Sequence, residues 1–252
     1  DPDPRTAGTA AGSRVTSALA VRRLSGSARS VNVAAPEPMT GLSPTNPQTA
    51  YAKCKTLVER DVSALASPTF SPTFLRNATA YGASPRMRFD IVLNNLSGLA
   101  ATTGKIVMTS DGTPWRPLVH VLDICESIAC TLEAPQDAIH NEIFNVGHDA
   151  DNFQVREIAQ IVADEFPGCE LTFGPPGGDN RSYRVSFGKI HTQLPGFHCA
   201  WDARKGAKQL HDVFGRIGMD RSTFEAKPFT RLKQLKYLSA SGQIDDRFFW
   251  KY

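Results

Sequence analysis

The chain has 252 residues, of which 41% are hydrophobic and 21% are charged, a balance typical of a soluble globular protein with a sizeable core. Its net charge is +3, and its Lys and Arg residues are interleaved with acids, which argues against a nucleic-acid partner. No apolar run reaches the roughly 18 residues of a membrane span, so no membrane partner is expected. The mild positive charge is compatible with an anionic small ligand.

The five cysteines form no recognisable disulfide or metal pattern. Their number is odd, and Cys125 and Cys130 lack a second Cys or His pair at a zinc-binding spacing. No secretory hydrophobic segment precedes the globular part. We therefore expect reduced thiols, no bound metal and a cytoplasmic protein.

Residues 1–35 differ in composition from the rest of the chain. They are mainly Ala, Ser, Arg, Thr and Gly, with no aromatic residue and no acid after Asp3. A segment of this kind buries little apolar surface, so we expect it to be disordered or loosely packed. Residues 36–252 have an ordinary globular composition and are expected to form the folded part.

From residue 36 onward, hydrophobic periodicity predicts strands that alternate with helices, which indicates an α/β fold. The expected helices cover about 47–66, 88–103, a segment after residue 120, 153–166, 203–216 and 222–239. The expected strands lie at 74–77, after residue 104, at 117–120, and within 142–148 and 169–174. Gly104 is expected to end the second helix, and Asn152 to cap the fourth.

Tyr51 and Lys55 stand four residues apart near the start of the first expected helix, so they project from one face of it. A phenol has a pKa near 10 in water, and a fixed ammonium group nearby favours its phenolate form. Such a pair can exchange a proton with a sugar hydroxyl while a hydride leaves the same carbon. On spacing alone, however, a solvated helix face explains the pair better.

An ordered series of motifs surrounds this pair. The pattern PxxPxxxYxxxKxxxE is followed by FLRNATAYG, LNNL, DGTPWRPLVHVLD and IFNVG. Over about residues 36–200, this series resembles the extended short-chain dehydrogenase/reductase family, and more narrowly the NAD-dependent epimerase/dehydratase enzymes that act on nucleotide-activated sugars. The resemblance implies a partial Rossmann-like parallel sheet, a smaller C-terminal substrate-binding lobe, NAD or NADP as cofactor and a nucleotide-sugar substrate. A homodimer is compatible with it.

The resemblance also implies roles near the cofactor. Tyr51 matches the catalytic Tyr, and Lys55 matches the Lys that supports it and contacts the nicotinamide ribose. Arg76 and Asn77 match the end of a sheet strand next to the cofactor. A catalytic Ser or Thr normally precedes the Tyr by about 25 residues, and Ser27 is the best candidate in a poorly matching window, with Ser25 as the other choice.

The resemblance also points to substrate-binding residues. Thr79 stands where family members often have an Asn that contacts substrate phosphate, Asn95 matches the second Asn of the Asn-Asn-Leu motif, which contacts the substrate diphosphate, and Arg116 matches the diphosphate-binding Arg after the Asp-Gly turn. An Arg fork suits a diphosphate because it donates two parallel, charge-assisted hydrogen bonds. Asp179 lies in a Gly-Gly-Asp loop where relatives contact the nucleotide ribose, and Arg181 is a further candidate for binding phosphate.

Nearby residues have simpler explanations. His120 and Asp123, in the HVLD motif, are expected to be structural, with Asp123 near a helix N-terminus where an acid is favoured. Trp115 and Tyr183 are more often packing residues than stacking platforms. Arg116 itself is also compatible with an ordinary surface position.

The sequence departs from the family because it contains no strand–GxxGxxG–helix unit, whose helix N-terminus holds the cofactor diphosphate in relatives. We therefore expect impaired binding of the cofactor.

Two hypotheses follow: an NAD-dependent nucleotide-sugar epimerase or related oxidoreductase, or a truncated or pseudoenzyme fragment that binds nucleotide sugar without turnover. A reductase of flavonoid or steroid ketones is disfavoured, since such substrates have no diphosphate for Asn95 and Arg116 to bind.

Overall fold

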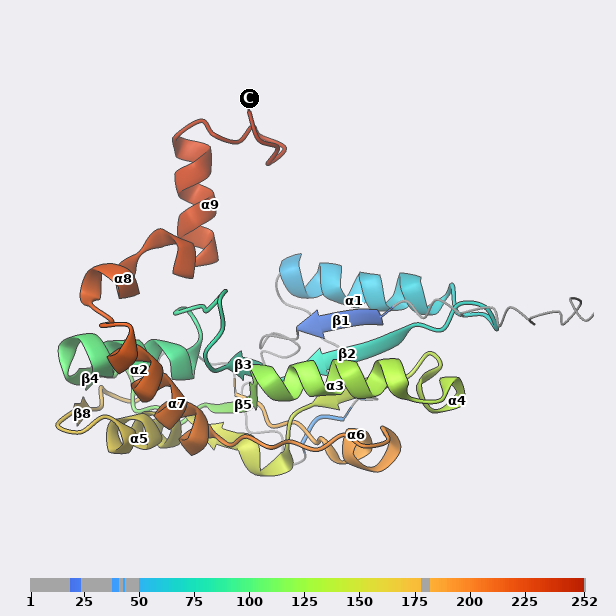
Figure 1. Cartoon of the computed structure of the whole chain (residues 1–252), viewed down its shortest axis with the longest axis horizontal. Coiled ribbons are helices and arrows are strands. Elements are labelled where there is room, and N and C mark those ends of the chain that lie inside the picture. Colours follow the sequence, from blue (N-terminus) through green and yellow to red (C-terminus); the bar gives the residue numbers. More distant parts are fainter. Residues whose placement is uncertain (1–18, 24–37, 41–42, 44–49, 178–181, 252) are drawn as a thin grey trace, which may run out of the picture.

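A computed structural model describes residues 19–23, 38–40, 43, 50–177 and 182–251 of the chain. Three parallel strands form one sheet in the order β1 (Leu19–Arg23), β2 (Thr73–Asn77) and β6 (Ile143–Val146). Figure 1 shows helix α1 (Ala50–Ser63) on one side of β1 and β2 and helix α3 (Val121–Glu133) on the other. This arrangement of helices on both faces of a parallel sheet is Rossmann-like, as the sequence predicts.

A second group of short strands extends this sheet region into a lobe. The strands β3 (Thr79–Tyr81), β5 (Trp115–His120) and β7 (Asn152–Gln154) pair in the order β3-β5-β7, and β4 (Lys105–Val107) pairs with β8 (Glu170–Thr172). Three helices pack together around them, namely α2 (Val92–Thr103), α5 (Val155–Glu165) and α7 (Ala203–Arg216). Figure 1 shows this group beside β4 and β8, away from β1 and β2.

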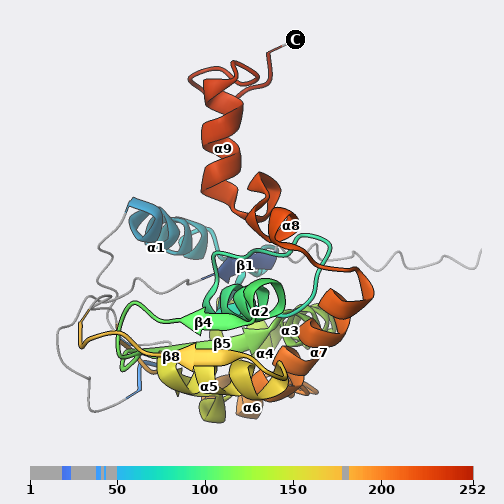
Figure 2. The ribbon, with the colours of Figure 1, turned by 90° about the vertical axis from the view of Figure 1, so that its left-hand side faces the viewer.

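Short elements complete the described part. They are α4 (Gln136–Ile139), the 3-10 turn η1 (Asp149–Asp151), α6 (Gly188–Gln193), α8 (Arg221–Glu225), the 3-10 turn η2 (Lys227–Phe229) and α9 (Arg231–Ala240). Helix α9 and the residues after it project away from both groups of strands (Figures 1 and 2). None of the described helices is both long and apolar enough to cross a membrane.

Strand β5 separates two hydrophobic cores. Successive side chains of a strand point to opposite faces, so fully buried Leu118 joins the core of the lobe while its neighbour Val119 joins the core of the sheet. The lobe core is closed by residues such as Leu210 of α7, and the sheet core by residues such as Phe144 of β6. One strand therefore fixes the position of the lobe relative to the parallel sheet.

A buried ion pair attaches α1 to the sheet. The Nε of Arg76, in the middle of β2, donates a hydrogen bond to Glu59 Oε2 (3.0 Å), and its Nη2 bonds to the other carboxylate oxygen. Both side chains are buried, with 7% and 11% of their surface exposed. The two parallel bonds fix the orientation of the helix as well as its distance from the strand.

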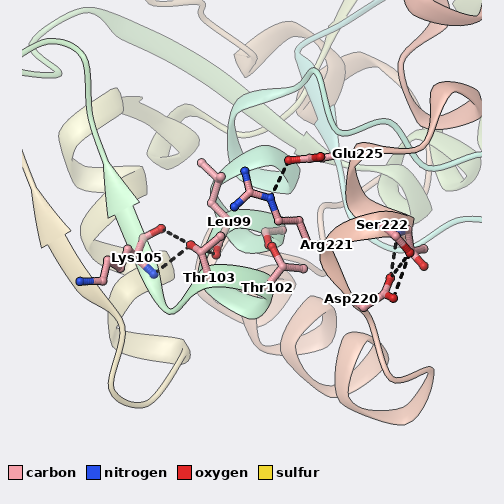
Figure 3. Close-up of polar contacts among 10 residues, drawn as sticks. Leu99, Thr102, Thr103, Lys105, Asp220, Arg221, Ser222 and Glu225 are labelled. Carbon is pink, nitrogen blue, oxygen red and sulfur yellow. Dashed lines mark hydrogen bonds and ion pairs between the residues drawn. The ribbon is translucent and has the colours of Figure 1, made fainter.

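Helix α8 packs against the end of α2. A Cβ atom at Gly98 would lie 2.3 Å from the Phe224 ring, so only glycine allows this approach. Asp220 caps α8 by accepting from the Thr223 backbone N–H (2.8 Å), and Arg221 pairs with Glu225 along the same helix (2.8 Å). Figure 3 shows these polar contacts opposite Thr102, near the C-terminal end of α2.

Most expected elements are present with small changes in their ends. Helix α7 spans residues 203–216 as expected, α2 ends at Gly104 in the left-handed conformation, and Asp123 lies in the first turn of α3. Strand β1 falls within residues 1–35, whose composition predicts disorder or loose packing, and it pairs in parallel with β2. Residues 47–49 of the first expected helix lie outside the described residues.

The prediction that Asn152 caps a helix is wrong. The helix begins at Val155 with Gln154 as its N-cap, and Asn152 begins β7 instead. The Asn152 amide bonds to the backbone of Val185, accepting from its N–H (2.8 Å) and donating to its carbonyl oxygen (2.9 Å). The side chain that the sequence assigns to a cap thus holds a distant loop.

The single helix expected over residues 222–239 is also wrong. The segment forms α8, η2 and α9 in succession. Pro228 explains the interruption, because proline has no backbone N–H and disfavours the helical conformation of the residue before it.

The ion pair gives a stability prediction. Replacing Glu59 by Ala removes the carboxylate that neutralises buried Arg76, so the free energy of unfolding should fall by about 3–5 kcal/mol in urea denaturation. Arg60→Ala, which breaks an exposed pair with Asp61 one residue away, should change it by less than about 0.5 kcal/mol. Equal effects of the two substitutions would show that the buried pair does not hold the helix.

Candidate active site

Helix α1 presents Tyr51 to solvent. Tyr51 is the second residue of the helix, and 47% of its surface is exposed. The Lys55 ammonium nitrogen lies 5.7 Å from the centroid of the Tyr51 ring. One turn further on, Glu59 is buried against the sheet. The three residues at i, i+4 and i+8 therefore run from an accessible phenol, through a half-buried cation, to a buried anchor.

Arg88 is a second cation near Tyr51. Its Nε donates to Asp90 Oδ1 (2.8 Å), and this bond raises the pKa of the Arg88 guanidinium above its ordinary value, with a smaller contribution from the Tyr51 phenolate charge. Arg88 is not among the residues to which the sequence points, since an Arg-x-Asp in the loop before α2 is its only local signal.

Two amide side chains at the start of α2 fix the loop that carries Arg88. Buried Asn94 accepts from the Gly82 backbone N–H (3.0 Å) and donates to the Arg88 carbonyl oxygen (3.1 Å). Asn95, predicted to bind substrate diphosphate, donates through Nδ2 to the Phe89 carbonyl oxygen (2.8 Å). This bond uses only the amide nitrogen of Asn95.

Asn77 stands at the carboxyl end of β2, where ligands of open parallel sheets are bound. Its side chain is buried, and its Oδ1 has no hydrogen-bond partner among the described residues. A buried carboxamide oxygen without a partner is costly unless a ligand or water donates to it. Its position and unmet acceptor fit the predicted cofactor contact. Arg76, predicted beside it, is engaged by Glu59.

Arg116 and Thr79 lie on adjacent strands of the lobe. Strands β3 and β5 pair in parallel, with Thr79 opposite Leu118, two residues beyond Arg116. The Arg116 guanidinium donates to the Trp115 carbonyl oxygen (2.7 Å) and lies 5.8 Å from the Tyr183 ring centroid. Both residues are half-buried. The structure therefore brings the two predicted phosphate contacts to one region.

Three predicted site residues, Ser27, Asp179 and Arg181, lie outside the described residues. The described flank of the last two begins at Ser182, whose hydroxyl accepts from the Trp115 backbone N–H (3.1 Å). Ser182 therefore contacts β5 at the residue next to Arg116.

The buried His120 of the HVLD motif packs against the loop that begins at Gly82. His120 is fully buried, accepts from the Leu122 backbone N–H (3.2 Å) as the N-cap of α3, and stacks on Trp201 at 4.0 Å between ring centroids. Gly82 has a φ of +105°, and a Cβ there would lie 2.2 Å from His120 Nε2. These contacts agree with the structural role expected for His120 and locate the loop that begins at Gly82.

Comparison with known proteins decides the family. The profile of the NAD dependent epimerase/dehydratase family matches residues 20–147, just over half of the chain. The chain belongs to this family. The match includes α1 with Tyr51 and Lys55, and it ends at the turn after β6.

Solved structures with folds similar to this chain include nucleotide-sugar epimerases and a dehydratase. A UDP-glucose 4-epimerase from Thermotoga maritima with UDP-glucose has a TM-score of 0.64 at 21% identity, covering 79% of this chain and 64% of its own. A UDP-glucuronic acid 4-epimerase from Bacillus cereus, in complex with UDP-glucuronic acid and NAD, has 0.64 at 17%, covering 80% and 62%. A dTDP-glucose 4,6-dehydratase from Streptomyces venezuelae has 0.61 at 19%, covering 79% and 61%. The epimerase/dehydratase chain thus spans less than two thirds of these proteins.

Three acidic residues, Asp123, Asp151 and Asp202, form a cluster in which the first two are buried. Burial raises the pKa of the Asp151 carboxyl from its ordinary 3.8 to about 7, and the negative charges of Asp202 and Asp123 add to the effect. Asp123 is itself held by the backbone N–H groups of Ala200 (2.9 Å) and Trp201 (3.3 Å). The cluster joins the starts of α3 and α7.

No group of three or more described His, Cys, Asp or Glu residues is placed to hold a metal ion.

The raised pKa predicts a dependence of stability on pH. Because the folded-state pKa of Asp151 lies above the unfolded one, its contribution to stability is complete below about pH 4 and is lost as the pH rises through about 7. Asp151→Asn should remove this loss. The free energy of unfolding of the variant, minus that of the wild type, should grow by a few kcal/mol between pH 4 and pH 7 and then level off. A difference that does not change with pH would contradict the raised pKa.

Proposed function

We propose that the chain serves a nucleotide-sugar oxidoreductase reaction of the epimerase type, in which Tyr51 and Lys55 form the acid–base pair. The observation that carries the proposal is the placement of Tyr51: an accessible phenol, on a helix anchored to the sheet by the Glu59–Arg76 pair, with the Lys55 ammonium nitrogen 5.7 Å from its ring centroid. The family match and the UDP-sugar complexes of similar folds support the substrate class.

The roles of the chain's own residues follow from these positions. The Tyr51 phenolate oxygen would take the proton of a sugar hydroxyl and later return it, and the Lys55 ammonium would stabilise the phenolate. Arg116, with Thr79 beside it, would bind the substrate diphosphate through charge-assisted hydrogen bonds. Asn77 and Lys55 would contact the cofactor. NAD, when bound, supplies the acceptor and donor of the hydride.

An alternative is a chain that binds nucleotide sugar without turning it over. The observation that favours it is the absence of a glycine-rich strand–turn–helix unit from the sequence. Backbone N–H groups of that unit normally hold the dinucleotide diphosphate. The two proposals differ in whether the polypeptide uses NAD, and they share the substrate site.

Turnover separates these proposals. NADH formation and sugar interconversion should be assayed with a panel of UDP- and dTDP-sugars. Tyr51→Phe should lower kcat by about 10²-fold or more, because it removes the proton-transfer oxygen. Lys55→Gln should also lower kcat, whereas Lys53→Gln, an exposed lysine on the same helix, should leave it unchanged. Nucleotide-sugar binding without turnover by the wild type would support the alternative.

Arg116 can be tested by binding alone, independently of turnover. Arg116→Gln should weaken UDP-glucose binding by about tenfold to a hundredfold in isothermal titration, since hydrogen bonds to a charged group are worth about 1.5–3 kcal/mol. Arg216→Gln, an exposed arginine at the end of α7, is the matched control and should bind as the wild type does. An unchanged affinity of the Arg116 variant would remove this residue from the substrate site.

A further inference from the structure

The net positive charge of the chain is concentrated at its C-terminal end. Residues 231–251, which we call the C-terminal arm, contain five Lys or Arg and two Asp or Glu, against 28 and 25 in the whole chain. The remaining residues therefore contain 23 of each and are neutral. The arm consists of α9 and the hairpin that follows it, and it projects from the rest of the molecule (Figures 1 and 2).

Helix α9 contacts the turn η2 that precedes it, where Lys227 Nζ lies 3.6 Å from the Tyr237 ring centroid, but it joins neither hydrophobic core. It has ten residues, and none of them is buried. Leu232, Leu235 and Leu238 recur at helical spacing, and the first of these has 61% of its surface exposed. Isolated helices shorter than about 12–15 residues are marginal in water. Leu232 and Leu235 are exposed and Leu238 is half-buried, so this row on a short helix points to a partner that covers it.

A closed hairpin follows α9. The Lys251 N–H donates to the Gln243 carbonyl oxygen (3.0 Å), and the Asp245 N–H donates to the Phe249 carbonyl oxygen (2.9 Å). The Asp245 carboxylate also accepts from the backbone N–H groups of Arg247 and Phe249, both at 2.9 Å. Asp245 is thus used to hold the turn, so one of the two acids of the arm is engaged by backbone.

The hairpin turns three consecutive aromatic residues toward solvent. Phe248, Phe249 and Trp250 have 67%, 68% and 58% of their surface exposed. Phe248 has a φ of +65°, a conformation that is unfavourable for a non-glycine residue and is often maintained at binding sites. The backbone bonds of the hairpin therefore maintain an aromatic tip instead of burying it.

The cations of the arm are also unengaged by acids. No ion pair among the described residues includes Arg231, Lys233 or Lys236. Outside the arm, by contrast, cations commonly pair with neighbouring acids, as Arg221 does with Glu225 in Figure 3 and Lys105 does with Glu170. The arm thus combines unneutralised positive charge with exposed leucine and aromatic side chains.

We propose that the C-terminal arm binds peripherally to the surface of an anionic lipid bilayer. Trp and Phe side chains enter the boundary between headgroups and acyl chains, while Lys and Arg contact the anionic headgroups. The binding of such a surface segment strengthens with the apolar area that it buries and with its attraction to anionic lipids, and the arm supplies both contributions. The expectation that the chain has no membrane partner came from the absence of a spanning segment, a criterion that does not apply to a surface-bound arm. Nucleic acid is less suitable, because its phosphates leave the leucine row uncovered.

Sedimentation with lipid vesicles tests this proposal on the full chain. The wild type should bind vesicles that contain roughly one third phosphatidylserine and should not bind pure phosphatidylcholine vesicles; raising the salt concentration should release it. Lys233→Gln with Lys236→Gln should lower the partition coefficient about tenfold to thirtyfold. The matched control, Lys105→Gln with Lys208→Gln, removes the same charge from exposed positions outside the arm and should bind normally.

A second double variant separates the apolar contribution. Phe249→Ala with Trp250→Ala should also lower binding about tenfold or more, with an unchanged circular dichroism spectrum, since these side chains do not pack in either core. No binding to anionic vesicles at low salt would overturn the proposal, as would equal effects of the arm and control variants. Self-association that disappears in the arm variants, without lipid binding, would assign the arm to a second copy of the chain instead.

Discussion

The attachment of α1 to β2 is the constraint on which the candidate site depends. The helix is mostly exposed, and only Ala52 and Glu59 are buried along its length. A helix with so little apolar contact would be free to shift along the sheet. The bidentate pair of Glu59 and Arg76 prevents this, because both charges are buried and each needs the other. The position of Tyr51, two turns before Glu59, follows from that anchor.

Buried polar groups organise the loops around the proposed substrate site. Asn94 ties Gly82 and the Arg88 carbonyl to the start of α2, and fully buried His120 determines how closely the Gly82 loop approaches β5. Asp123 then holds the segment at Trp201 that leads into α7. Two cores that share β5 support these loops, so the cations beside Tyr51 and the cations of the lobe are presented on a common framework.

Local sequence patterns predicted most of the helices and strands. The ends of α7 and the glycine stop of α2 follow from periodicity and capping chemistry. The order of motifs gives Tyr51 and Lys55 as the expected acid–base pair, which stays a prediction. Long-range pairings could not be predicted in this way. Asn is a residue type that commonly caps helices, but Asn152 bonds to Val185, 33 residues later. The electrostatic interaction of Arg88 with Tyr51 depends on a loop fold that no local pattern encodes.

A crystal structure of the chain with UDP-glucose bound would show whether α1 and the lobe together form one nucleotide-sugar site. We expect the diphosphate on the Arg116 guanidinium and a hexose hydroxyl within hydrogen-bond reach of Tyr51 Oη, about 2.6–3.2 Å. A ligand bound elsewhere, or one that lies on Arg116 with its hexose directed away from α1, would contradict it.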